Sequence, residues 1–231
     1  MSHHVCIVGG GSAIAQGLID YFLDKGDRVT AVCYRAGPTN PNRERLKILM
    51  GMDMAVGTNA AKLGDLDPIH VLITLMGSVD NSLLENMKAD QWHAVLHSTL
   101  TSVFQTLRAA YPALATPSNV IVVGSIVGAT GGRGCANYAA AKEALKGLVR
   151  ATANEWSGRG LEYLGRVVNL LELGYCNLGM GTRLGKYKDV LLESIPLGRF
   201  ADMEDIIPAI EFLATTRYCT GNVLTLAGGM R

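Results

Sequence analysis

Three residues in the middle of the chain carry side chains that suit proton transfer. Ser125 precedes Tyr138 by thirteen residues, and Lys142 follows the tyrosine by four. Positions i and i+4 share one face of a helix, so we expect the Lys142 ammonium to lower the pKa of the Tyr138 phenol from about 10 towards neutral pH. Such a phenol is a general acid, and a serine hydroxyl beside it can hold the carbonyl oxygen that takes the proton. Ser125, Tyr138 and Lys142 are therefore the predicted catalytic residues of a carbonyl reduction.

A glycine-rich segment near the start of the chain indicates a nucleotide site. Gly9, Gly10, Gly11 and Ser12 lie between a hydrophobic run and a helical pattern. Small residues let the backbone turn sharply and approach a pyrophosphate, whose charge then meets the free N–H groups of the helix start. By itself the segment could be a turn that binds no nucleotide, and tyrosine–lysine pairs are common on helix faces. Together the two motifs favour a nucleotide-dependent reductase.

The end of the second expected strand indicates which nucleotide is bound. An acidic residue roughly twenty residues after the glycine turn would accept hydrogen bonds from the ribose 2′-hydroxyl of NAD. This sequence has Cys33, Tyr34 and Arg35 there instead. Arg35 can pair with a 2′-phosphate through charge-assisted hydrogen bonds, which predicts NADP(H) as the cofactor. A solvated arginine at a strand end is the alternative.

These groups require a scaffold that brings several strand ends together. Short apolar runs rich in β-branched residues alternate with longer stretches of helical periodicity. That pattern is typical of an α/β fold, a doubly wound parallel sheet of the Rossmann type with helices on both faces. No repeat or linker divides the chain, so we expect one NADP(H)-binding domain over residues 1–231. Strands are expected at residues 5–8, 29–34, 71–75, 120–124, 167–171 and 223–226.

Composition excludes several other classes of protein. The 231 residues include 21 basic and 20 acidic side chains spread along the chain, giving a formal net charge of +1. No charge tract favours a nucleic acid or a membrane surface as partner. The five cysteines are widely spaced without a CxxC pair, which argues against a disulfide framework and a metal site. With no leader pattern and no long apolar run, we expect a cytoplasmic protein.

Over its whole length the chain resembles the short-chain dehydrogenases/reductases, and in particular the 3-oxoacyl-acyl-carrier-protein reductases. Besides the serine, tyrosine and lysine, the resemblance rests on three stretches: residues 137–142 (Asn-Tyr-Ala-Ala-Ala-Lys), 196–200 (Pro-Leu-Gly-Arg-Phe), and 220–229, which begin with Thr-Gly and end with Gly-Gly. It implies NADPH-dependent reduction of a 3-oxo group on an acyl thioester or polyketide-like intermediate, with Tyr138 as general acid. The substrate would be a small molecule or bound to a carrier protein, and the enzyme a homotetramer or homodimer.

The resemblance also implies a set of cofactor contacts along the chain. The glycine turn would hold the phosphates, the end of the second strand the 2′-phosphate and the following loop the adenine. Residues after the later strands would surround the nicotinamide and its ribose. The implied residues are Gly9, Gly10, Gly11, Ser12, Ile14, Tyr34, Arg35, Asp53, Met54, Gly77, Tyr138, Lys142, Gly174 and Cys176.

The sequence departs from the family at several positions near these residues. Thr99 stands where a helix asparagine usually completes the catalytic set, and residues 74–77 read Thr-Leu-Met-Gly in place of Asn-Asn-Ala-Gly. The usual Pro-Gly pair is Leu173-Gly174, preceded by Glu172, which we expect to be partly exposed or paired with a base rather than to contact substrate. Residues 177–186 are expected to form part of a substrate lid, with Arg183 near the place of a carrier-docking arginine.

These departures keep two other functions open. One is a relative that retains the acid Tyr138 but performs a cyclisation or isomerisation. The other is a degenerate member that binds a nucleotide without catalysis. Retention of Ser125, Tyr138 and Lys142 counts against the second, since a protein freed from catalysis has no physical need for the three together.

Overall fold

The structure, a computed structural model, describes residues 2–157, 165–179 and 188–231. Its centre is a seven-stranded sheet in which every neighbouring pair is parallel, in the order β3-β2-β1-β4-β5-β6-β7. The strands are β1 (His4–Val8), β2 (Arg28–Val32), β3 (Leu46–Leu49), β4 (Ile69–Thr74), β5 (Leu114–Ser125), β6 (Arg166–Leu173) and β7 (Val223–Leu226).

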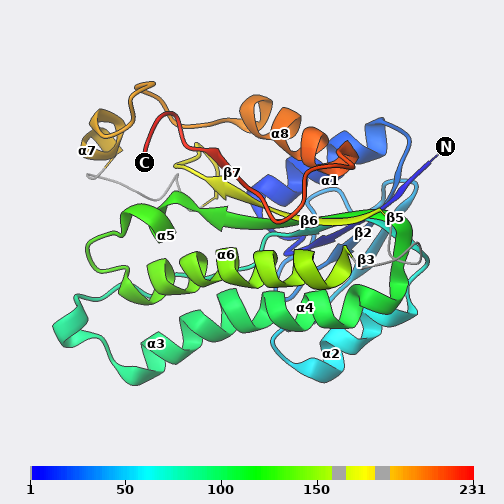
Figure 1. The fold of residues 1–231 in the computed structure, drawn as a ribbon, viewed down its shortest axis with the longest axis horizontal. Coiled ribbons are helices and arrows are strands. Elements are labelled where there is room, and N and C mark those ends of the chain that lie inside the picture. Colours follow the sequence, from blue (N-terminus) through cyan, green and yellow to red (C-terminus); the bar gives the residue numbers. More distant parts are fainter. Residues whose placement is uncertain (1, 158–164, 180–187) are drawn as a thin grey trace.

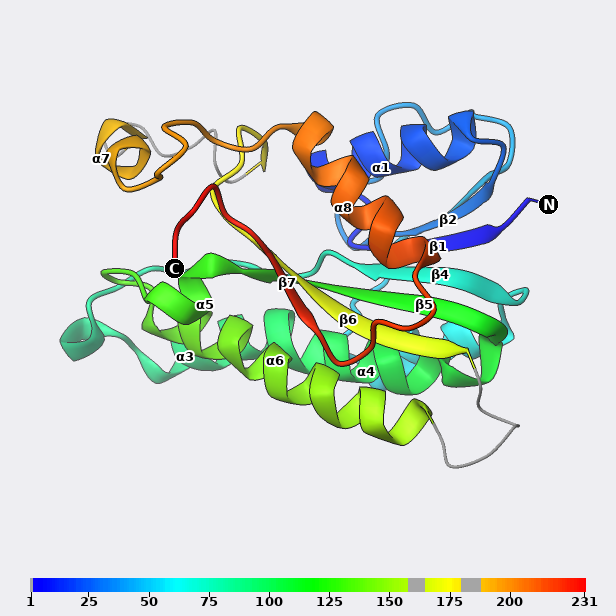
Figure 2. The ribbon, with the colours of Figure 1, turned by 45° about the horizontal axis from the view of Figure 1, so that its top comes forward.

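Helices cover both faces of the sheet. In Figure 1 and in the turned view of Figure 2, α1 (Ala13–Asp24) and α8 (Met203–Thr215) lie on one face, and α3 (Ala89–Leu96), α4 (Ser102–Ala110) and α6 (Ala136–Trp156) on the other. The predicted doubly wound α/β fold is confirmed. Shorter helices are α2 (Gly57–Ala61), α5 (Ile126–Thr130) and α7 (Lys188–Glu193), with single turns at Lys62–Asp65, Leu84–Asn86, His97–Thr101 and Tyr111–Ala113.

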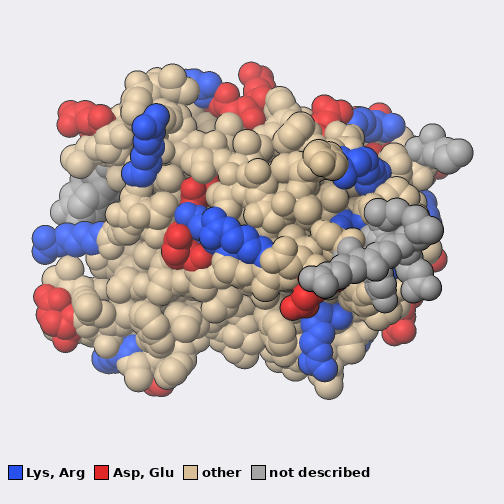
Figure 3. All heavy atoms as spheres, in the orientation of Figure 1, with Lys and Arg blue, Asp and Glu red and all other residues tan. Residues whose placement is uncertain are grey.

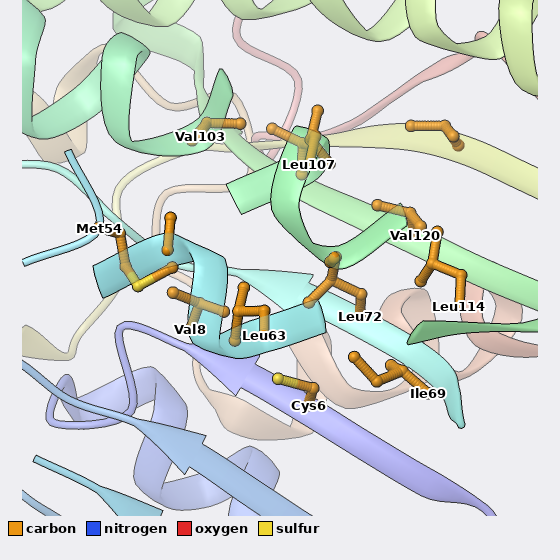
Figure 4. Packing of buried hydrophobic residues seen from close by; sticks show 14 of the residues in the cluster. Cys6, Val8, Met54, Leu63, Ile69, Leu72, Val103, Leu107, Leu114 and Val120 are labelled. Carbon is orange, nitrogen blue, oxygen red and sulfur yellow. The ribbon is translucent and has the colours of Figure 1, made fainter. Parts of the chain in front are cut away.

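The strands are apolar on both sides because each side packs against a helical layer. Successive side chains point to opposite faces, so Leu72 joins the cluster under α4 and α6 while Ile73 joins the cluster under α1 and α8. Figure 4 shows the first cluster, in which side chains from β1 and β4 meet those of α4. This two-sided burial explains why the strands read as continuous hydrophobic runs in the sequence.

The observed strands differ from the expected ones at several ends, most of all in β5, which begins at Leu114 rather than at Val120, and one strand was not expected. β3 was missed altogether: it is a four-residue edge strand whose side chains are half-buried or exposed, so it carries no long apolar run. β2 ends at Val32, which leaves Tyr34 and Arg35 in the following loop. β6 extends through Glu172 to Leu173, because the carboxylate is neutralised within the fold.

Glu172 pairs with a base and is buried, rather than partly exposed. Only 3% of its surface is exposed. One carboxylate oxygen lies 2.7 Å from Nζ of Lys146 on α6, and the other accepts a hydrogen bond from the Thr225 hydroxyl on β7. Lys146 also pairs with Glu143 at 2.8 Å. The glutamate thus joins α6, β6 and β7.

Charged side chains of both signs are scattered over the face shown in Figure 3, without an extended basic patch. None of the helices in the described ranges is long and apolar enough to cross a membrane. The described residues also contain no group of three or more His, Cys, Asp or Glu that could hold a metal ion.

His4 at the start of β1 makes the fold sensitive to acid. Its ring is buried, with Nε2 2.8 Å from the Thr30 hydroxyl and Nδ1 3.1 Å from the main-chain oxygen of Asp67. Burial lowers the pKa of His4 below its ordinary value of 6.5. The unfolded chain therefore takes up the proton first as the pH falls, so this part of the stability is present above about pH 6.5 and is lost below it.

We predict that the free energy of unfolding falls more steeply between pH 7.5 and pH 5 in the wild type than in His4→Gln, which cannot take up the proton. Each pKa unit of difference between the two states corresponds to about 1.4 kcal/mol. Urea unfolding at the two pH values measures this. His93→Gln, at an exposed position on α3, serves as the matched control and should keep the wild-type pH dependence. Equal slopes for wild type and His4→Gln would contradict the assignment.

Candidate active site

The candidate site lies where the strand order reverses. β1 is flanked by β2 on one side and by β4 on the other, and in open α/β sheets the crevice outside the carboxyl ends of such strands is where ligands bind. Because all strands are parallel, the segments that leave β1, β4, β5 and β6 emerge at the same edge. The glycine turn, Gly77, Ser125 and Gly174 all lie in or directly after these segments.

The glycine turn after β1 is shaped for close approach of a ligand. The N–H groups of Gly9 and Gly10 both donate to the Val32 carbonyl at 3.0 Å. Gly9 has a φ of +90°, and a Cβ there would lie 3.0 Å from the main chain of Leu75. Ser12 caps α1 by accepting a hydrogen bond from the N–H of residue 15. The remaining N–H groups of the first helical turn, including that of Ile14, have no acceptor within the helix, which fits a phosphate.

The four residues expected to contact the 2′-phosphate and the adenine differ in exposure and in hydrogen bonding. Tyr34 and Arg35 are exposed, and the Arg35 guanidinium stacks over the Tyr34 ring at 5.1 Å from its centroid. The Asp53 carboxylate accepts a hydrogen bond from the N–H of Ala55 at 3.1 Å. Met54 is buried in the core cluster (Figure 4), so its side chain does not face the site and only its main chain can contact an adenine.

Ser125 and Tyr138 come together at the end of β5. Ser125 is the last residue of the strand and caps α5 by accepting a hydrogen bond from the N–H of Val127 at 3.3 Å. Tyr138 lies in the first turn of α6, which packs closely against α5. Burial raises the pKa of the Tyr138 phenol, and a hydrogen bond with the Ser125 side chain opposes that rise. The two side chains therefore lie beside each other at the end of β5.

Lys142 lies one helical turn beyond Tyr138, as the spacing predicts, but its ammonium group binds main-chain carbonyls rather than the Tyr138 hydroxyl. Nζ is 5.8 Å from the Tyr138 ring centroid and donates to the carbonyls of Met76 at 3.1 Å and Val123 at 2.9 Å. Burial lowers the pKa of Lys142 to about 8. The expected lowering of the phenol's pKa by Lys142 is wrong for this arrangement, because desolvation dominates and the ammonium is held by the ends of β4 and β5.

Thr99 faces the same small region as Lys142. It is fully buried in a π-helical turn between α3 and α4, and its hydroxyl has no hydrogen-bond partner in the part of the chain that the structure describes. A Cβ on Gly77 would lie 3.3 Å from this hydroxyl and 3.5 Å from Nζ of Lys142. Glycine at this position therefore avoids a close contact with both polar groups.

The opposite side of the site is built from the segment after β6. A Cβ on Gly174 would lie 2.7 Å from Cα of Ala227, so only glycine fits there. Cys176 is buried and forms a parallel bridge with Ala201, and burial raises the pKa of its thiol to about 11. Most of the expected lid at 177–186, including Arg183, lies outside the described residues.

Asn137 is a structural part of the site that we did not single out from the sequence beyond its place in the motif. It is fully buried directly before Tyr138. Its amide nitrogen donates to the carbonyls of Asp80 at 3.0 Å and Gln91 at 3.2 Å, and its side-chain oxygen accepts the Tyr138 N–H at 2.8 Å. The only indication of this role in the sequence was an amide side chain directly before Tyr138, near the start of the helix.

We predict that Asn137→Asp lowers the free energy of unfolding by about 2 to 4 kcal/mol, because the change puts a carboxylate at a fully buried position, against two main-chain carbonyl oxygens that lose their donor. Chemical denaturation measures the effect. Asn86→Asp adds the same charge at an exposed position nearby and should change stability by less than about 0.5 kcal/mol. A change no larger in Asn137→Asp than in this control would show that the amide bridge contributes nothing to stability.

Comparison with known proteins gives a consistent family relationship. A family model described as enoyl-(acyl carrier protein) reductase matches residues 52–231. The 3-oxoacyl-(acyl-carrier-protein) reductase of Salmonella typhimurium is 33% identical over 175 residues, which cover 74% of this chain and 68% of that protein. The enzyme of the same name from Rattus norvegicus is 30% identical over 240 residues, covering 98% of each chain.

Solved structures share the fold. A blue fluorescent protein from a metagenomic library, solved in complex with NADPH, superposes with a TM-score of 0.87 at 22% identity, covering 98% of this chain and 97% of that one. A short-chain dehydrogenase family protein from Francisella tularensis superposes with a TM-score of 0.86 at 15% identity, covering 99% and 98% of the two chains.

Proposed function

This chain belongs to the short-chain dehydrogenase/reductase family of oxidoreductases, and we propose that it reduces a carbonyl group to an alcohol with NADPH. The observation that carries the proposal is the placing of Ser125 and Tyr138 beside each other at the sheet edge that also holds the glycine turn. Lys142 lies one helical turn away.

The chemistry follows from these hydroxyl groups. A nicotinamide cofactor bound at the sheet edge supplies the hydride that the carbonyl carbon receives. Ser125 donates a hydrogen bond to the carbonyl oxygen, and Tyr138 gives the same oxygen its proton, so the C=O group becomes CH–OH. The raised pKa of Tyr138 keeps the proton on the phenol until the oxygen gains negative charge. Lys142 lies one helical turn away, with its ammonium held by the carbonyls of Met76 and Val123.

NADPH is proposed over NADH because of the charge at the end of β2. Arg35 is exposed on the loop that follows the strand, and no acidic side chain occupies the positions directly after Val32. A guanidinium there attracts a 2′-phosphate, whereas a carboxylate would repel it. The metagenomic blue fluorescent protein, which shares this fold, was solved with NADPH bound, and this supports the same choice of nucleotide.

As substrate we propose a 3-oxo group on an acyl thioester or polyketide-like intermediate, free or bound to a carrier protein. The two curated relatives described above are named for that reaction. The matching family model, by contrast, carries the description enoyl-(acyl carrier protein) reductase. The proposal follows these two relatives, whose names specify an oxo group as the group reduced.

We further propose that the enzyme works as a homodimer or homotetramer in the cytoplasm. The family resemblance supports the assembly, and light scattering on the purified protein tests it. The location is supported by the cysteines, all five of which are free thiols in the structure. Free thiols suit a reducing compartment.

We predict that Tyr138→Phe lowers the rate of reduction of a 3-oxoacyl thioester by at least about a hundredfold, because the general acid is removed. The fall in NADPH absorbance measures the rate. Tyr218→Phe, at a fully exposed position, is the matched control and should retain wild-type activity. Full activity in Tyr138→Phe would refute the assigned acid. Conversion of substrate without NADPH consumption would favour the cyclase or isomerase alternative, and binding without any turnover the non-catalytic one.

We also predict that Arg35→Asp weakens binding of NADPH by about tenfold to a hundredfold and leaves NADH little changed, because the variant exchanges charge-assisted hydrogen bonds to the 2′-phosphate for repulsion. Dissociation constants for both nucleotides test this. Arg150→Asp makes the same charge change at an exposed position on α6 and should affect neither. Equal losses for the two nucleotides in Arg35→Asp would contradict the cofactor assignment.

A further inference from the structure

The side chain of Gln16 connects the glycine turn to the loop that follows β2. Gln16 lies in the first half of α1, and its amide nitrogen donates to the Gly10 carbonyl at 3.0 Å. Its amide oxygen accepts two hydrogen bonds from Thr39, one from the main-chain N–H at 2.7 Å and one from the hydroxyl at 3.1 Å. One side chain thus uses both ends of its amide to bridge two segments that are separate in the sequence.

Packing around this bridge holds the loop close to the glycine turn. Pro38 is buried although the residues on either side of it are not. A Cβ on Gly11 would lie only 2.1 Å from the carbonyl oxygen of Ala36, so the loop touches the turn at a point where no side chain fits. A Cβ on Gly37 would lie 3.2 Å from the Met50 sulfur, which places the loop's other side against the segment after β3.

Both ends of the loop are therefore fixed, with Arg35 between them. At the strand end, the Cys33 N–H donates to Leu49 at 2.8 Å, and the Cys33 carbonyl accepts from the N–H of Met52 at 2.9 Å. At the other end, Thr39 is held by Gln16. A short connection anchored at both ends has already lost most of its backbone freedom, so a ligand that contacts it incurs less of the ordering cost.

We propose that Gln16 and Thr39 form a strap that positions Arg35 and thereby sets the preference of the site for a 2′-phosphorylated nucleotide. The inference rests on the proposed NADPH-dependent function and adds specificity-determining residues to it. A 2′-phosphate needs the guanidinium in a defined place, so it gains from an ordered loop. A nucleotide with a free 2′-hydroxyl makes no such contact and gains little. Gln16 is a positioning residue, because it acts through the loop.

The test is calorimetric binding of NADP⁺ and of NAD⁺ to the full-length protein, in the wild type and in variants of the strap. We expect Gln16→Ala to weaken binding of NADP⁺ by about tenfold and binding of NAD⁺ by less than about twofold. Tenfold corresponds to about 1.4 kcal/mol, which is roughly the cost of ordering the backbone of one residue when the ligand binds. Thr39→Val removes only the hydroxyl donor and should give a smaller effect of the same kind. Thr39→Ser keeps both donors and should match the wild type.

Gln105→Ala on α4 removes a half-buried glutamine outside the site and is the matched control. Hydrogen exchange of residues 34–41 gives a second measurement without any nucleotide: exchange should be faster in Gln16→Ala than in the wild type or the control. Unchanged exchange, or equal weakening of NADP⁺ and NAD⁺ in Gln16→Ala, would overturn the strap, since Gln16 would then do no more than shape the glycine turn through Gly10.

The outcomes separate this inference from the proposed function. A wild type that prefers NADP⁺, with the same preference in Gln16→Ala, would overturn the strap and leave the cofactor assignment in place. A wild type that binds both nucleotides equally would overturn the cofactor assignment and, with it, the role of the strap in specificity.

Discussion

Parallel pairing around β1 is the constraint on which the candidate active site depends. β1 hydrogen-bonds to β2 on one side and to β4 on the other, so the chain changes the direction in which it extends the sheet at this strand. Every loop that leaves a carboxyl end then reaches the same edge. The turn at Gly9 lies against Leu75, and the next residue, Met76, accepts a hydrogen bond from Lys142. Two short contacts thus join the glycine turn to α6.

Burial shifts the pKa values of two ionisable groups in the candidate site. Lys142 is almost wholly buried, and this desolvation lowers its pKa to about 8, while its ammonium donates to two main-chain carbonyls. The same desolvation holds the proton on the Tyr138 phenol. Perturbed pKa values of this origin are typical of functional sites. One turn further along α6, Lys146 is neutralised by Glu143 and Glu172, so the helix packs on the sheet without an unpaired cation at that level.

Much of the fold could be predicted because its long strands are buried on both faces and its helices have one apolar face. β3 could not be predicted, because an edge strand of four half-buried or exposed residues has neither a continuous apolar run nor a helical apolar face. Glu172 was hard to place for a related reason: a carboxylate inside a strand reads as a surface residue until its partners are known. Asn137 was overlooked as a structural bridge because its partners, Asp80 and Gln91, belong to another segment.

By itself, the sequence determined the alternation of strands and helices and the placing of Tyr138 and Lys142 on one helix face, because periodicity and the i, i+4 relation are properties of a single segment. Only the tertiary structure decided that the Lys142 ammonium turns to the ends of β4 and β5, that Met54 packs into the core, and that Gln16 reaches Thr39. Each of these depends on contacts between segments far apart in the chain. Strand order and packing set the relative positions of such segments, and the local sequence pattern does not reveal them.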